Sequence, residues 1–180
     1  QGIGPAEESR IVAACGQVDI TIRYENGIQQ VLLNGENVSG LIRDEAVGNM
    51  ASATSVYLPV REKLVELQKQ LAAREDVVMD GRDIGTCVLP HAQVKIYLTA
   101  SVEERARRRC LELQKKGQEA DLENIQETIR QRDYRDMHRE MSPLVQAEDA
   151  VLVDTSDLTV DEVIARILEI AAEKGIKAKK

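Results

Sequence analysis

The chain has 180 residues and a formal net charge of −7, with 43% hydrophobic and 31% charged side chains. This length and composition predict one soluble globular domain, or one domain that carries an insert. The acidic balance argues against a surface for nucleic acid or for an anionic membrane. Four tyrosines without any Phe or Trp argue against stacking platforms for single-stranded nucleic acid.

The sequence also bears on the cellular compartment. No apolar run reaches the length of a transmembrane helix, and no signal-peptide pattern is present. The three cysteines, Cys15, Cys87 and Cys110, are odd in number and lack a Cys-x-x-Cys spacing. We therefore expect reduced thiols and a cytoplasmic protein, and dispersed cysteines of this kind do not favour a zinc site.

The first part of the chain predicts a hairpin between helices. Alternating apolar residues on both sides of the turn Glu25-Asn26-Gly27 are typical of a β-hairpin. The predicted segments are, in order, a helix at 6–15, strands at 18–23 and 28–33, and helical periodicity from 44 to 73 that is interrupted at Pro59.

The rest of the chain alternates short apolar strands with capped helices. Ser101 with Glu104 has the spacing of a helix capping box, and Thr159 and Glu162 are expected to open the last helix. This alternation predicts a parallel α/β sheet, whose ligands bind outside the carboxyl ends of its strands. The predicted strands are at 77–79, 94–98 and 150–154, and the predicted helices are at 101–117, 122–140 and 159–175.

One loop follows a predicted strand directly and has the sequence Asp80-Gly81-Arg82-Asp83-Ile84-Gly85-Thr86. A guanidinium beside carboxylates offers both a phosphate donor and hydrogen-bond acceptors, and glycine lets the backbone approach a ligand closely. The alternative is a tight turn with a local Asp–Arg ion pair. Because the loop lies at the end of a predicted strand, a binding site is favoured over a simple turn.

Arginines are concentrated between positions 105 and 139, which hold eight of the fifteen in the chain. Those at the end of this segment recur at spacings of three and four and therefore share one helix face. A solvated face with weak ion pairs is the alternative. The use of Arg rather than Lys favours phosphate, whose oxygens match the guanidinium fork. The eight are Arg105, Arg107, Arg108, Arg109, Arg130, Arg132, Arg135 and Arg139.

The loop belongs to a longer series of motifs, at 78–86, 89–90, 94–96, 101–106, 132–136, 143–144 and 154–159. This series resembles the bacterial cytidylate kinases, which are P-loop nucleoside-monophosphate kinases. The resemblance covers essentially the whole chain without a break in register, and the combination of motifs is far more specific than the loop alone.

The resemblance implies an α/β fold with the parallel sheet of the P-loop nucleoside-monophosphate kinases. Residues 1–74 are expected to form the α+β monophosphate-binding insert, and residues 75–180 the core domain with a short Arg-rich helical lid at about 105–122. The family begins with a strand and a Gly-rich loop ending in Lys. No Gly-Lys dipeptide occurs in these 180 residues, so the central strand and the P-loop are expected to be absent from this chain.

The resemblance also implies that CMP or dCMP is the phosphoryl acceptor. Ser52, Arg61 and Asp83 match the positions that recognise cytosine. A carboxylate there accepts a hydrogen bond from the cytosine amino group and penalises uracil, which would leave it unpaired. Arg132 and Asp136 match the pair that contacts the ribose.

The remaining expected roles concern phosphate. Arg82 and Arg139 match residues that hold the CMP phosphate, and Arg105 and Arg108 are expected to contact the phosphates of ATP, which binds with Mg²⁺. Phosphoryl transfer needs alignment and charge neutralisation rather than an acid–base pair. The expected catalytic residues are therefore Arg82, Arg108, Arg132 and Arg139.

The sequence thus predicts a (d)CMP kinase of which these 180 residues bind CMP but do not catalyse alone. Two alternatives remain: a non-catalytic nucleotide-binding fragment, and a P-loop kinase for another small acceptor. The expected partners are CMP or dCMP and ATP, with no nucleic acid and no membrane, and the resemblance suggests a monomer.

Overall fold

The computed structural model describes residues 2–176, except for the side chain of Glu45. The chain divides into two compact units, one ending at Val77 and the other beginning at Val78, and each is described by itself. Among the described residues, no helix is both long and apolar enough to cross a membrane.

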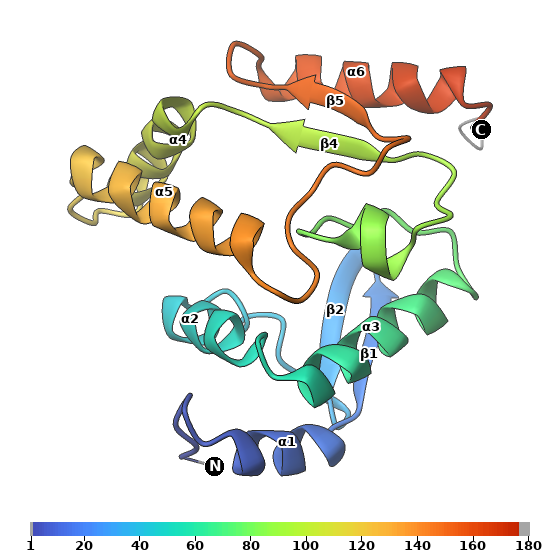
Figure 1. The fold of residues 1–180 in the computed structure, drawn as a ribbon, viewed down its shortest axis with the longest axis vertical. Helices are drawn as coiled ribbons and strands as arrows, with labels where there is room; N and C mark the ends of the chain where they lie inside the picture. Colours follow the sequence, from blue (N-terminus) through green and yellow to red (C-terminus); the bar gives the residue numbers. More distant parts are fainter. Residues whose placement is uncertain (1, 177–180) are drawn as a thin grey trace. The chain divides into compact units, whose positions relative to one another are not determined.

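The first unit combines a small antiparallel sheet with three helices (Figure 1). The sheet has the strand order β1-β2-β3, and the β1–β2 pairing runs from Ile20 opposite Leu33 to Glu25 opposite Ile28. Its elements are α1 (Glu8–Gly16), β1 (Ile20–Glu25), β2 (Ile28–Leu33), β3 (Glu36–Asn37), α2 (Glu45–Thr54) and α3 (Leu58–Ala72).

The predicted hairpin is confirmed, and its turn chemistry is repeated at the next turn. Asn26 and Gly27 join β1 to β2 with φ of 53° and 78°, and Asn34 and Gly35 join β2 to β3 with φ of 52° and 84°. Two successive residues with positive φ are what a type I′ hairpin turn requires, and Asn-Gly is the pair that adopts it at least cost.

Polar links and a few apolar contacts hold the helices of the first unit. Ile11 on α1 and Val60 on α3 are buried. The Lys63 ammonium on α3 donates hydrogen bonds to the carbonyl oxygens of Cys15 and Val18, at the C-terminal end of α1. The carbonyls at this end of a helix point away from its last turn, and a lysine there gives them a further donor and opposes the negative end of the helix dipole.

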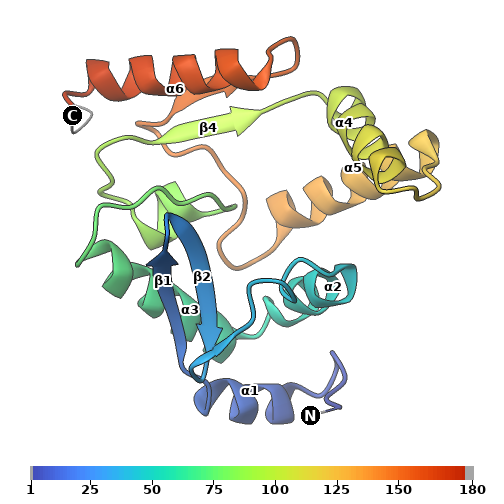
Figure 2. The ribbon, with the colours of Figure 1, turned by 180° about the vertical axis from the view of Figure 1, so that it is seen from behind.

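The second unit contains the predicted parallel pairing, so the α/β class is confirmed. Strands β4 and β5 are paired in parallel, from Ile96 beside Val151 to Thr99 beside Asp154. Both views show α6 lying along this sheet and α4 beside α5 (Figures 1 and 2). The elements are the π-helix η1 (Ile84–Val88), β4 (Ile96–Thr99), α4 (Val102–Lys115), α5 (Leu122–His138), β5 (Val151–Asp154) and α6 (Val160–Glu173).

The prediction of a strand at 77–79 is wrong. These residues have no regular structure, and the Val78 side chain is fully exposed. A strand forms only where a neighbour pairs with its backbone, and within residues 2–176 no such neighbour lies beside this segment. The strand predicted at 94–98 exists, but it begins later, at Ile96, because pairing with β5 begins only there.

Helix ends follow the sequence signals closely. Thr159 and Glu162 form the complete capping box at the start of α6. The Ser101 hydroxyl accepts from the Glu104 amide at 3.1 Å, but the Glu104 carboxylate does not return to Ser101, so the predicted box is only half formed. At the C-terminal ends, Gly117 and Gly175 have φ of 71° and 82°, the left-handed conformation that closes a helix.

The core of the second unit is aliphatic and small, as expected from the lack of Phe and Trp. Its buried apolar side chains come from η1, the residue after β4, α4, β5 and α6. They are, in this order, Val88, Ala100, Ala106, Val153 and Ile170.

Candidate nucleotide-binding site

The loop that follows Val78 is shaped by a glycine and a π-helix. A Cβ at Gly81 would lie 2.8 Å from Cγ1 of Ile84, so no larger residue fits without moving Ile84. Asp83 precedes η1, and its carbonyl oxygen accepts from the Cys87 amide at 2.8 Å. π-Helical turns are rare and are frequent at functional sites. This local geometry determines where Arg82 and Asp83 leave the backbone.

The second unit gathers three arginines and two aspartates that the sequence predicts as ligands. Asp136 accepts a hydrogen bond from Nε of Arg82 at 2.7 Å, and Nε of Arg132 lies 3.9 Å from the same oxygen. The Asp136 side chain is mostly buried, whereas Arg132 is largely exposed. We call this group the arginine–aspartate cluster; its members are Arg82, Asp83, Arg132, Asp136 and Arg139.

Arg139 is the most unusual member of the cluster. Its Nε donates to the carbonyl oxygen of Ser142 at 2.7 Å, and its Nη2 lies 3.9 Å from Oδ1 of Asp83, which is too far for a hydrogen bond. Nη2 is buried and has no hydrogen-bond partner in the described part of the chain. A buried donor without an acceptor costs about 1–3 kcal/mol, more for a charged group, so this nitrogen is suited to an acceptor from a ligand.

The charges of the cluster favour an anion. Three guanidiniums oppose two carboxylates, so one positive charge remains. The guanidiniums converge from two elements, because Arg82 is on the loop and the others come from α5 and its C-terminal end. A convergent set of arginine forks is the arrangement that proteins use for phosphate oxygens.

Arg105 and Arg108, predicted to contact ATP, lie one turn apart on α4 and have partners within the chain. Arg105 donates to both carboxylate oxygens of Asp133 on α5, at 3.0 and 2.7 Å, and to the Ala100 carbonyl. Arg108 donates to the carbonyl and the hydroxyl of Thr155, directly after β5. The structure therefore places both arginines at the carboxyl ends of β4 and β5 rather than within the arginine–aspartate cluster.

Glu104 is a strongly acidic group beside these arginines. The hydrogen bonds from Arg107, and in second place from Arg108, lower the pKa of its carboxyl group to about 2. Its two oxygens accept from Nε and Nη2 of Arg107 and from Nε of Arg108, each at 2.7 Å. Arg107 is therefore neutralised locally, and the charge available from Arg108 is reduced.

Ser52 and Arg61 belong to the first unit. Ser52 is exposed on α2, and its carbonyl oxygen accepts from the Ser55 hydroxyl at 2.8 Å. Arg61 lies on α3, half-buried, with its amide bonded to the Tyr57 carbonyl. The structure describes these two residues within their own unit only, so the predicted cytosine contact shared with Asp83 stays a prediction.

Sequence reasoning assigned no role to two residues that the structure shows to be engaged. Asp133 forms the ion pair with Arg105, and Thr155 is buried and donates its hydroxyl to the Thr99 carbonyl at 3.0 Å. Asp133 could have been found from its place between Arg132 and Arg135. Nothing local in the sequence marks Thr155, since its burial follows from the pairing of β4 with β5.

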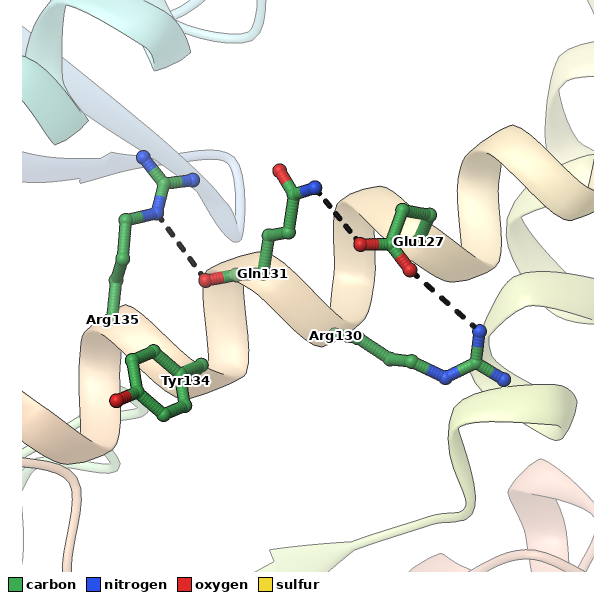
Figure 3. Close-up of a pocket in the computed structure, with 5 residues that line it drawn as sticks. All are labelled: Glu127, Arg130, Gln131, Tyr134 and Arg135. Carbon is green, nitrogen blue, oxygen red and sulfur yellow. Dashed lines mark hydrogen bonds and ion pairs between the residues drawn. The ribbon is translucent and has the colours of Figure 1, made fainter.

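A surface pocket of about 560 Å³ also lies along α5 (Figure 3). The polar contacts drawn there are within one helix: Gln131 donates to Glu127 at 2.9 Å, and Arg135 donates to the Gln131 carbonyl at 3.3 Å. This pocket shares α5 with the arginine–aspartate cluster but no residue. Its lining residues are Glu127, Arg130, Gln131, Tyr134 and Arg135.

Within residues 2–176, no group of three or more His, Cys, Asp or Glu side chains could hold a metal ion. All three cysteines are free thiols. Guanidiniums gather in the second unit beside a parallel sheet. This combination is typical of the class of α/β proteins that bind phosphorylated ligands.

Comparison with known proteins makes the assignment specific. The cytidylate kinase family matches residues 1–173. The cytidylate kinase of Lactobacillus gasseri is 48% identical over 168 residues, which are 93% of this chain and 73% of the relative. That of Caldicellulosiruptor saccharolyticus is 49% identical over 164 residues, 91% and 73% of the two chains. The cytidylate kinase of Bacillus licheniformis is 46% identical over 179 residues, which are 98% of this chain and 79% of the relative.

The chain belongs to the cytidylate kinase family. It is accordingly a nucleotide-binding kinase of the family that phosphorylates nucleoside monophosphates, and the family implies the P-loop nucleoside-monophosphate kinase fold.

Proposed function

We propose that this chain binds CMP or dCMP and presents its phosphate to MgATP for phosphoryl transfer. The observation that carries the proposal is Nη2 of Arg139, a buried donor with no hydrogen-bond partner in the described residues. A phosphate oxygen supplies the missing acceptor and the negative charge that the arginine–aspartate cluster lacks.

The roles within the cluster follow from its contacts and from the family. Arg82 and Arg139 hold the CMP phosphate, and Arg132 with Asp136 contacts the ribose. The 2.7 Å contact between Arg82 and Asp136 supports this division, since one guanidinium there can face a phosphate while the carboxylate accepts from a hydroxyl. Asp83, together with Ser52 and Arg61 from the first unit, recognises cytosine. In this proposal the first unit is the monophosphate-binding insert.

Catalysis in this proposal is electrostatic. Arg82 and Arg139 neutralise the acceptor phosphate, and Arg132 adds positive charge from its place at the ribose, so that a CMP oxygen can approach the γ-phosphorus of ATP. Arg105 and Arg108, within the lid at about 105–122, contact the phosphates of MgATP through the N–H groups that their partners in the chain leave free. Arg108 thereby stabilises the phosphoryl group in transfer. No residue has to act as a general acid or base.

Calorimetric titration of the purified chain with CMP and with cytidine tests the phosphate site. We expect CMP to bind and cytidine to bind at least about tenfold more weakly, because charge-assisted hydrogen bonds contribute about 1.5–3 kcal/mol each. Arg139→Lys keeps the charge but loses the guanidinium fork, and it should remove most of the preference for CMP. Arg135→Lys, on α5 but outside the cluster, is the matched control. Equal affinities of the wild type for the two ligands would refute the proposal.

A variant of Asp83 distinguishes a (d)CMP kinase from a kinase for another small acceptor. We expect Asp83→Ala to bring the affinities for CMP and UMP within about threefold of each other, because the carboxylate that distinguishes the two bases is removed. The same titration with both nucleotides measures this ratio. An unchanged preference for CMP in the variant would exclude Asp83 as the base-reading residue and would favour another acceptor site.

A further inference from the structure

Polar links join helix α5 to other elements of the second unit. Within the described residues, no side chain of α5 is fully buried, although Ile125 and Ile129 are half-buried. The mostly buried side chains that connect it to other elements are carboxylates: Asp136 bonds to Arg82, and Asp133 bonds to Arg105. Ion pairs therefore contribute to the position of this helix.

The Arg105–Asp133 pair is the best formed of these links. Two parallel hydrogen bonds of 3.0 and 2.7 Å join the guanidinium to the carboxylate, and Nε of Arg105 donates to the Ala100 carbonyl at 3.0 Å. Only 35% of the Arg105 side chain and 20% of the Asp133 side chain are exposed. Ala100 directly follows β4, so one guanidinium ties α5 to the end of the parallel sheet.

The Arg105–Asp133 pair differs from the ion pairs of the arginine–aspartate cluster because a bound nucleotide does not compete for its atoms. The Arg82–Asp136 and Arg139–Asp83 contacts lie inside the arginine–aspartate cluster, so a bound nucleotide competes for their atoms. Asp133 is outside the cluster and keeps its partner when CMP binds. A guanidinium has five N–H groups, of which Arg105 uses three here, so two remain for another anion.

We propose that Asp133 is a positioning residue of the nucleotide site, which acts through Arg105. It holds α5 at the end of β4, and Arg132 and Asp136, which are within one helical turn of it, are thereby kept in position for the ribose of CMP. This inference rests on the proposed function, because it assumes that CMP binds in the arginine–aspartate cluster.

Asp133→Asn tests the inference by removing the charge and one acceptor oxygen while keeping the size of the side chain. Calorimetry at a temperature where circular dichroism shows full helix content should give a CMP dissociation constant about ten- to hundredfold higher than that of the wild type, the range for a misplaced binding group. Asp133→Glu keeps the charge and should stay within about threefold of the wild type. Glu127→Gln, the same chemical change on α5 outside the pair, should leave the affinity unchanged.

A purely structural role predicts something else. If Asp133→Asn lowered only the thermal midpoint and bound CMP like the wild type, Asp133 would be a stabilising residue and the inference would be overturned, while the proposed function would stand. A wild type that binds no CMP would overturn both. Should Asp133→Asn not fold, Arg105→Lys removes the paired hydrogen bonds and keeps the charge; the same loss of CMP affinity is expected there, and an unchanged affinity would again overturn the inference.

Discussion

Ile84 decides which residue can occupy position 81. The sequence predicts Gly81 as a site of close approach to a ligand, and the structure adds a reason within the chain, since a Cβ there would lie 2.8 and 3.0 Å from two carbons of Ile84. Gly85 is different, because its nearest neighbour would be Cδ of Lys95 at 3.4 Å, an ordinary contact with a flexible side chain. A side chain is therefore excluded at Gly81 but has room at Gly85.

We expect Gly81→Ala to lower the free energy of unfolding by about 1–3 kcal/mol, the usual cost of forcing an extra carbon into a packed site. Because Ile84 begins η1, the displacement should also move Arg82 and Asp83 and weaken CMP binding. Urea unfolding and calorimetry measure the two effects. Gly85→Ala is the control, with a change in unfolding free energy within about 0.5 kcal/mol. Equal losses in the two variants would contradict this account of the loop.

Elements are positioned here by arginine as much as by apolar packing. Helix α4 carries Arg105, which reaches α5, and Arg108, which reaches the end of β5. The sequence predicts Glu104 as the second half of a capping box. In the structure its carboxylate instead accepts from Arg107 and Arg108, because two guanidiniums on the same helix face offer stronger partners than one backbone amide.

The pH dependence of stability tests this pairing of Glu104. Its pKa is lowered from 4.5 to about 2 by the hydrogen bonds of Arg107 and then Arg108. The ionised carboxylate therefore stabilises the fold above pH 4.5 or so, and this contribution is lost as the pH falls toward about 2. We expect Glu104→Gln to reduce the fall of the thermal midpoint across this window, whereas Glu103→Gln, one residue away, should follow the wild type. Identical profiles for Glu104→Gln and the wild type would contradict the pairing.

At the scale of the whole molecule, the chain divides into two compact units. Ser52 and Arg61 lie in the first unit, and the arginine–aspartate cluster lies in the second. The relatives compared are longer than the part that matches, since this chain covers 73–79% of their length.

We expect the 180 residues alone to bind CMP without forming ADP from MgATP. The reason is that the Gly-Lys dipeptide, with which a Walker A loop holds the ATP phosphates, does not occur in these 180 residues. A coupled assay for ADP measures turnover, and CMP titration of the same preparation verifies that the protein is folded. Turnover well above the background of a protein-free reaction would contradict this expectation.

The sequence by itself determined the local structure, because turns and caps depend on neighbours in the chain: Asn26-Gly27 gave the hairpin, and Thr159 with Glu162 gave the start of α6. Specific motifs likewise determined the family. Only the tertiary structure decided which charges meet. Arg105 pairs with Asp133, 28 residues away, and a buried nitrogen of Arg139 finds no hydrogen-bond partner among residues 2–176; both depend on how helices pack against a sheet. The strand predicted at 77–79 failed for the same reason, since a strand exists only through a partner that its own sequence does not encode.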